Sequence, residues 1–205
     1  WSAPDVLIGD AGTFVRQPVA VRPNGDFLLG TFLCRTDQGV KWVGDNDISV
    51  ARLSSDQGQT WRRVEVPDSV GAVHMNIVEA GKGDLLALYR SRWADFIYHS
   101  RSCDEGRSWS APEPTELPNN NSSIQATRLH DGRLALVYNH SSAANASERR
   151  LSLYDEIEDD EEVSAPTAEG PKPLRSAFWG APRAPLVLAL SEDGGRSWPI
   201  RHELD

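Results

Sequence analysis

The chain has 205 residues and a formal net charge of −9, seven units of which come from the acidic run at residues 155–162. Outside this solvated run the chain is close to neutral, and nothing in its composition favours nucleic-acid binding, which would call for a strongly basic face. No apolar run is long enough to cross a membrane. Cys34 and Cys103 are too few for a disulfide framework, and we expect two separate buried or half-buried thiols.

Short β-branched and apolar runs, bounded by Gly, Asn and Asp, predict strands along the whole chain, and no stretch has helical periodicity. The runs form three groups of three in chain order: residues 15–21, 27–33 and 48–53; residues 75–79, 85–89 and 96–101; and residues 124–129, 133–138 and 186–190. Residues 141–182 interrupt the third group with an acidic and then Pro-, Ala- and Gly-rich sequence. We expect this long stretch to be a surface insertion.

The same eight-residue pattern, S-x-D-x-G-x-[ST]-W, closes each group of strands. It occurs at residues 54–61, 102–109 and 191–198. In such a turn the Asp side chain can accept backbone hydrogen bonds, the Gly can take a positive φ, and the Trp can pack beneath the turn. The first four residues, WSAP, repeat residues 109–112. We therefore expect Trp1 to end a fourth copy whose beginning is missing.

The octet resembles the Asp box, or BNR repeat, of sialidases and related β-propeller proteins. Segments outside the octets are also similar to sialidase-like sequences, namely residues 90–92, 117–121, 131–140 and 183–186. The resemblance implies an all-β fold, a six-bladed β-propeller, in which the octets are structural and lie away from the active site. A blade takes roughly 40–50 residues. We therefore expect residues 1–205 to be a single but partial propeller region of about four blades. Because the N-terminus is expected to be missing, both a secreted and a cytoplasmic location stay open.

Strand order predicts which residues share a face of the propeller. Consecutive antiparallel strands reverse direction, so the start of each first strand and the loop between the second and third strands lie opposite the octet turns. The face defined in this way contains Arg16, residues 35–47, His74, Asn76, residues 90–95, residues 119–125 and residues 139–183. In a propeller these positions surround the mouth of the central channel.

Five arginines fall on this face: Arg16, Arg35, Arg90, Arg92 and Arg183. A guanidinium group binds a carboxylate through two hydrogen bonds and keeps its charge, which suits an anionic sugar. The resemblance implies the same role, because sialidases bind the sialic acid carboxylate with three arginines. Residues 13–18 (TFVRQP) resemble the family's F/Y-R-I-P motif, with an additional Val before the Arg. The neutral candidates for sugar hydroxyl groups are His74, Asn76, Asn121, Gln125 and Asn139.

The resemblance also implies a loop Asp as acid/base between the first-motif Arg and the first octet. Of the carboxylates there, Asp37, Asp45 and Asp47, we predict that Asp45 has this role, which requires a raised pKa and access to the glycosidic oxygen. The alternative is that Asp45 caps a turn or pairs with a nearby cation. The sialidase nucleophile is a Tyr, and the two strand tyrosines Tyr89 and Tyr138 are more typical of core residues.

These observations favour an exo-glycosidase that acts on a terminal acidic sugar, sialic acid or a relative, without a metal or another cofactor. Two alternatives stay open. One is a polysaccharide lyase on uronic acids, with His74 or a Tyr abstracting the α-proton; the other is a non-catalytic carbohydrate-binding propeller. Phe178 and Trp179 lie on the predicted face and are candidates for stacking on a sugar ring as part of a lid.

Overall fold

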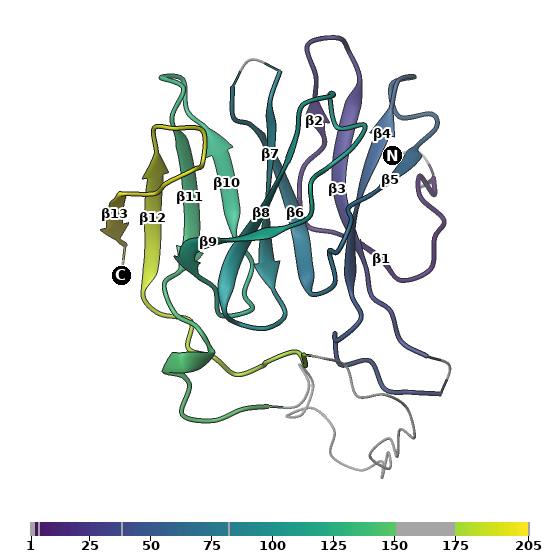
Figure 1. Ribbon diagram of the computed structural model, residues 1–205. Helices are drawn as coiled ribbons and strands as arrows, with labels where there is room; N and C mark the ends of the chain where they lie inside the picture. The colour runs from purple at the N-terminus through teal and green to yellow at the C-terminus, as the bar shows by residue number, and fades with distance from the viewer. Residues whose placement is uncertain (1–2, 4, 38, 82, 151–174, 205) are drawn as a thin grey trace.

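The computed structural model describes residues 3, 5–37, 39–81, 83–150 and 175–204, and it is built from three antiparallel sheets (Figure 1). The first sheet contains β1 (Thr13–Val15), β2 (Ala20–Val21), β3 (Phe27–Leu33), β4 (Ile48–Ser54) and β5 (Arg62–Glu65). The second contains β6 (Ala72–Glu79), β7 (Leu85–Ser91), β8 (Phe96–Ser102) and β9 (Glu113–Pro118). The third contains β10 (Gln125–Arg128), β11 (Leu134–Asn139), β12 (Leu186–Ser191) and β13 (Ile200–Glu203).

Each sheet follows the order of the chain, so neighbouring strands are also consecutive in sequence. This confirms the predicted grouping, with the octet joining the third strand of each sheet to the fourth. One strand differs: the run predicted at residues 15–21 forms two short strands, both paired with β3. Pro18 lies between them, and because proline has no N–H it cannot continue the ladder.

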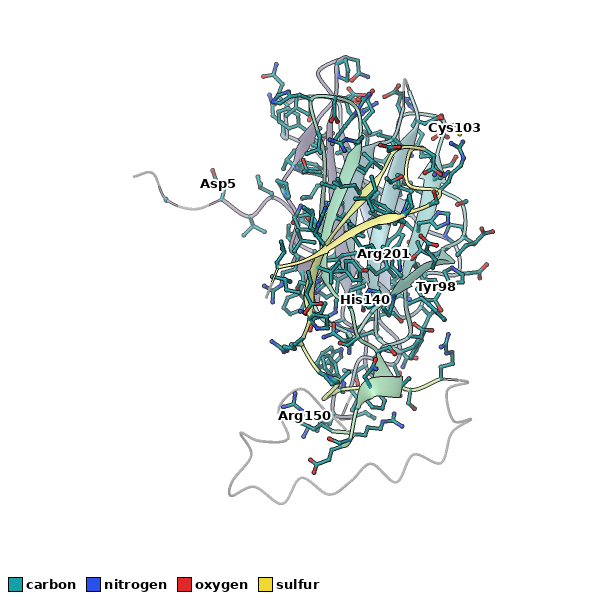
Figure 2. The ribbon with its side chains drawn as sticks, turned by 90° about the vertical axis from the view of Figure 1, so that its left-hand side faces the viewer. Asp5, Tyr98, Cys103, His140, Arg150 and Arg201 are labelled. Atoms are coloured by element: carbon teal, nitrogen blue, oxygen red, sulfur yellow. The ribbon has the colours of Figure 1, made fainter. Side chains whose placement is uncertain are left out.

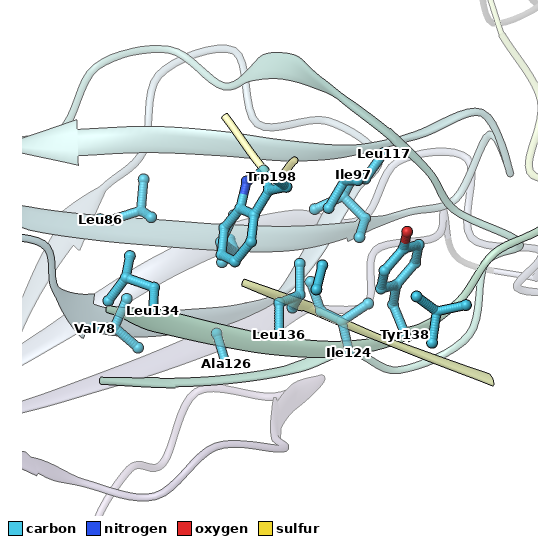
Figure 3. Packing of buried hydrophobic residues seen from close by; sticks show 13 residues of the cluster. Val78, Leu86, Ile97, Leu117, Ile124, Ala126, Leu134, Leu136, Tyr138 and Trp198 are labelled. Atoms are coloured by element: carbon cyan, nitrogen blue, oxygen red, sulfur yellow. The ribbon is translucent and has the colours of Figure 1, made fainter. Parts of the chain in front are cut away.

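Apolar side chains from adjacent sheets pack together and fix the sheets as neighbouring blades. One buried cluster joins the second sheet to the third and includes Leu86, Ile97, Leu136 and Trp198 (Figure 3). Another joins the first sheet to the second and includes Leu28, Met75 and Trp109. The middle strands β4 and β7 are buried along their whole length, so the packing of one sheet against the next builds the fold.

The three octets form the turn that their sequence predicts. In the last copy Asp193 accepts hydrogen bonds from the Ser197 backbone N–H at 2.9 Å and the Ser197 hydroxyl at 2.7 Å, while Ser191 Oγ accepts the Gly195 N–H at 2.8 Å. The Gly of each octet has a positive φ of 82–89°. Trp198 and Trp109 are buried in the cores between blades and anchor their octet turns, whereas Trp61 is half-buried.

The described residues form three blades, where the length of the chain predicted about four. The difference lies in the connection from β11 to β12, which spans residues 140–185 and contains only one 3₁₀ turn, Ala143–Asn145, within its described part. The acidic run at residues 155–162 lies outside the described residues. The predicted insertion at residues 141–182 falls within this connection, between β11 and β12.

The octet turns and the long loops lie at opposite ends of the sheets, as the strand order predicts. Cys103, in the second octet, lies at one end and Arg150, in the long connection, at the other (Figure 2). Both cysteines are free thiols; Cys34 is half-buried, whereas Cys103 is exposed because it sits at the tip of its turn. The described part of the chain contains no helix long and apolar enough to span a membrane.

Candidate functional site

A cavity of about 250 Å³ lies at the loop end of the first two blades. Its walls are aromatic and its polar groups are mostly cationic. The residues that line it are Phe14, Arg16, Phe32, Cys34, Trp42, His74, Arg90, Arg92 and Trp179. Four of these nine were predicted site residues, namely Arg16, His74, Arg90 and Arg92. The topology thus brings together side chains from β1 to β7 and a residue from the long insertion.

Arg90, near the end of β7, is buried and has no carboxylate partner among the described residues. Its Nε donates to Asn121 Oδ1 at 3.0 Å, and its Nη1 lies 3.4 Å from His74 Nε2. Burial and the nearby positive charges of Arg92 and Arg16 lower the pKa of Arg90. Both side-chain hydrogen-bond partners are neutral, and Asp47, the carboxylate whose charge favours the charged form of Arg90, is itself paired with Arg92. A buried charge is costly without a counter-ion, and an anion in the cavity would supply one.

His74 reaches Arg90 through an irregularity in β6. Val73 pairs with Arg90 and Asn76 with Leu88, so two residues of β6, His74 and Met75, oppose the single residue Tyr89. His74 has φ 58°, the left-handed conformation that a glycine would usually adopt in such a bulge. Burial and the neighbouring arginines lower the pKa of His74 to about 2. The imidazole is therefore neutral; if Nε2 accepts from Arg90, Nδ1 donates to Ser123 Oγ at 3.2 Å.

Arg92 also faces the cavity, but its charge is neutralised. Its Nε and Nη2 donate to Asp47 Oδ2 at 2.9 and 2.7 Å. The guanidinium lies over the rings of Trp42 and Trp179, with its Cζ 5.2 and 5.1 Å from their centroids. Arg92 is thus enclosed by a carboxylate and two indoles, which makes it part of the cavity wall.

Residues 175–182, which we call the covering segment, place Trp179 against the cavity. The Ala177 N–H donates to Asp45 Oδ1 at 2.6 Å, the Phe178 N–H to the Arg92 carbonyl at 2.7 Å, and Trp179 Nε1 to the Val43 carbonyl at 3.0 Å. Asn121 Nδ2 also donates to the Phe178 carbonyl at 3.0 Å. These bonds tie the segment to loops of the first two blades and to the loop between β9 and β10, so Trp179 is a fixed wall. Phe178 does not line the cavity.

Asp45 is thus placed beside the cavity, with its carboxylate turned to the covering segment. Arg35 is exposed and lines a separate open depression together with Asp37. Arg16 is exposed and makes no hydrogen bond or ion pair with the described residues. Of the five predicted arginines, Arg16 and Arg90 line the cavity without an ion-pair partner among the described residues and are available to a ligand there. Arg92 is paired with Asp47, and Arg35 and Arg183 do not line the cavity.

The remaining predicted polar residues lie around the cavity and do not line it. Asn76 Oδ1 accepts the Ala126 N–H and links the second blade to the third. Asn139 Nδ2 donates to the carbonyl of Arg183, whose side chain is exposed. Gln125 and Arg16 both line a second cavity of about 250 Å³ beside the first. Asn121 acts on the site indirectly, because it fixes Arg90.

Neither strand tyrosine lines the Arg90 cavity. Tyr89 is fully buried, and its hydroxyl pairs with Ser100 Oγ at 2.6 Å; burial raises its pKa. The Tyr138 hydroxyl lies 2.6 Å from His140 Nδ1, and burial raises its pKa to about 12. Tyr89 is a core residue of the kind that the sequence indicated, whereas Tyr138 is largely buried but lines the second cavity together with Arg16.

Of the aromatic walls, Trp179 was a candidate for stacking on a sugar ring, whereas Phe32 and Trp42 were not predicted. Phe32 follows Leu28 and Gly30 on the face of β3 that packs on the second blade, so strand alternation offered a signal for it. Trp42 is in the loop that contains the candidate carboxylates, and no local pattern marks it. No group of three or more His, Cys, Asp or Glu suited to a metal ion occurs within the described ranges.

Successive antiparallel blades, each with the same octet turn, define the chain as part of a β-propeller. The chain belongs to the BNR repeat-like domain family, which matches residues 1–205. No curated protein matches it.

Several solved structures are similar in fold. The Hadza microbial sialidase Hz136 aligns with a TM-score of 0.56 and 16% identity over 91% of this chain and 29% of its own. The K499G mutant of NanB sialidase from Streptococcus pneumoniae aligns with a TM-score of 0.53 and 15% identity, over 91% of this chain and 23% of its own. A protein of unknown function from Dyadobacter fermentans aligns with a TM-score of 0.52 and 23% identity, over 62% of this chain and 34% of its own. At these identities the likeness shows the fold alone, and the chain spans about a third or less of each structure.

Proposed function

We propose that this chain contributes the acidic-sugar pocket of a sialidase-like exo-glycosidase, in which Arg90 and Arg16 bind the carboxylate of a terminal sugar, sialic acid or a relative. The observation that carries the proposal is the buried guanidinium of Arg90, which has only the neutral partners Asn121 and His74. Two of the proteins similar in fold are named as sialidases. Membership of a fold leaves the reaction open, so the argument depends on the site.

The shape of the cavity supports a sugar as the ligand. Aromatic rings such as Trp42 and Trp179 offer flat apolar faces, and a pyranose ring has an apolar face of its own. Binding sites of this kind combine apolar walls with a few placed polar groups. A ligand with one carboxylate toward Arg90 and a ring between the indoles would satisfy both features.

For catalysis, Asp45 stays our candidate acid/base, since it lies on the loop beside the cavity and holds the covering segment through Ala177. The described residues that line the cavity include no carboxylate and no tyrosine. This observation favours a second candidate function, a propeller that binds acidic glycans without cleaving them. The lyase alternative gains no support from His74, because an imidazole with a pKa of about 2 is a weak base.

The test uses the complete natural protein. We would follow fluorophore release from a fluorogenic sialoside and, in parallel, the formation of unsaturated uronate from uronate-containing polysaccharides. Binding of the free acidic sugars would be measured by calorimetry. Arg90→Ala is expected to weaken binding of the carboxylate-bearing sugar by roughly 10- to 100-fold, as for the loss of charge-assisted hydrogen bonds.

Arg62→Ala is the matched control, since Arg62 is an exposed arginine on β5. Unchanged binding in Arg90→Ala would refute the proposal. Binding without turnover in the wild-type protein would favour the non-catalytic propeller, and unsaturated product without sialoside turnover would favour the lyase.

A further inference from the structure

We infer that Gly30, a residue of β3 that does not line the cavity, is a positioning residue that sets His74 against Arg90. The inference rests on the proposed function insofar as Arg90 is taken to bind the carboxylate. Its evidence is independent of that function, because it comes from the packing of β3 on the bulge in β6.

The bulge brings the backbone of β6 very close to β3. A Cβ atom added to Gly30 would lie 2.0 Å from the Met75 carbonyl oxygen and 3.0 Å from both the carbonyl carbon and the Cβ of Met75. Two of these three atoms belong to the backbone, so a rotamer change cannot relieve the contact. Gly30 is therefore required by the close approach of β6 and not by its own φ, which is not left-handed.

Met75 follows His74 directly, so the position of the Met75 carbonyl fixes the bulge that turns His74 inward. The His74 ring then packs on Phe32, two residues beyond Gly30 on the same strand, with centroids 4.7 Å apart. The ring is enclosed by Arg90 on one side and Ser123 on the other. Relief of the clash with an added Cβ would require the Met75 backbone to move, and the adjacent His74, whose Nε2 lies 3.4 Å from Arg90 Nη1, would move with it.

The strain in the bulge points to a role beyond packing. A left-handed residue other than glycine is retained where the surrounding structure enforces it, and such residues concentrate at functional sites. Both side-chain partners of Arg90 are of this kind, since Asn121 also has φ 58°. Two left-handed residues, a His and the more tolerant Asn, thus present neutral acceptors to one guanidinium, which orients Arg90 without neutralising it.

The test compares Gly30→Ala with Gly81→Ala in the complete protein. Gly81 is the matched control, because no atom lies within 4 Å of an added Cβ and its φ is not left-handed. Two quantities are measured: affinity for the acidic sugar and the titration of the His74 imidazole by NMR. His74→Asn identifies the His74 resonance, and Asn tolerates the left-handed backbone.

We expect Gly30→Ala to fold, to bind the sugar roughly tenfold more weakly, and to show His74 titrating close to its ordinary pKa of about 6.5. The titration reports how deeply the His74 ring is buried and how close it lies to Arg90, Arg92 and Arg16. A general loss of stability that left the ring in place would not change this pKa. Gly81→Ala is expected to match the wild type in both measurements.

Three outcomes would overturn the inference. A folded Gly30→Ala protein with unchanged His74 titration would show that Gly30 does not set the ring. A Gly30→Ala chain that fails to fold would make Gly30 a residue of core packing alone. Full affinity in His74→Asn would show that Arg90 needs no positioning by the imidazole. Failure of the proposed function is separate, because it is read from Arg90→Ala.

Discussion

Asp47 and Arg92 form an ion pair in which the side chains are 0% and 3% exposed. Asp47 Oδ2 accepts both guanidinium hydrogen bonds, and Oδ1 accepts the Arg35 N–H at 3.1 Å and Trp42 Nε1 at 2.9 Å. The pair connects the loop after β3 with the end of β7, across the boundary between two blades. The pair also makes two nearby arginines differ in charge compensation, because Arg92 forms an ion pair with Asp47 and Arg90 forms none with the described residues.

Asp47→Ala should therefore destabilise the protein strongly. Removal of one partner leaves the Arg92 charge buried without compensation, a change that costs about 3–5 kcal/mol of unfolding free energy. Urea denaturation would measure this. Asp131→Ala is the control, since Asp131 pairs with Arg133 at the surface and should contribute less than about 1 kcal/mol. Similar losses in the two variants would contradict a special role for the buried pair.

Stability should depend on pH through His74. The pKa of His74 is about 2 in the folded protein and about 6.5 in an unfolded chain. Between these values the unfolded state binds a proton that the folded state does not, so the unfolding free energy falls as the pH is lowered, by up to about 1.4 kcal/mol per unit. Above pH 6.5 the residue contributes no pH dependence.

His74→Asn removes this part of the acid sensitivity. The unfolding free energies at pH 7.5 and 4.5 should differ by about 2.7 kcal/mol less in the variant than in the wild type. The other four histidines are common to both proteins and cancel in the comparison. An equal pH dependence in both would show that His74 titrates normally and is not enclosed by the arginines.

Asp45 can be tested by two substitutions. If it is the acid/base, Asp45→Asn should lower kcat by about 10²–10⁴-fold, although the amide oxygen can still accept the Ala177 N–H. Asp45→Ala removes both the carboxylate and this hydrogen bond. Normal kcat in Asp45→Asn together with a loss in Asp45→Ala would instead assign Asp45 to holding the covering segment.

The octet turn should contribute measurable stability. Asp193→Ala removes the hydrogen bonds to the Ser197 N–H and hydroxyl, to the Arg196 N–H and to the Ser191 hydroxyl. We expect a loss of about 1–2 kcal/mol in unfolding free energy, measured by urea denaturation. Glu192→Ala changes the adjacent exposed carboxylate and should be nearly neutral. A neutral Asp193→Ala would mean that the turn forms without its side-chain bonds.

The octets were predictable because their interactions are local. Each one contains the Asp, the Ser or Thr hydroxyl and the glycine that together close the turn, and all these groups lie within eight residues. The strands between octets were predictable for a similar reason, since apolar runs and turn residues alternate along the chain. From the order of strands alone it followed that Arg16, His74 and Arg90 share one end of the sheets.

The sequence by itself determined the propeller blades, the octet turns and the face that carries the arginines, because these follow from local hydrogen bonding and strand direction. Only the tertiary structure decided which arginine keeps a free charge. Asp47 neutralises Arg92 from 45 residues away, Trp179 closes the cavity from the insertion, and Gly30 admits the bulge that aims His74. These relationships depend on how one blade packs against the next. A shift of a single residue in strand register would give each of these side chains a different partner.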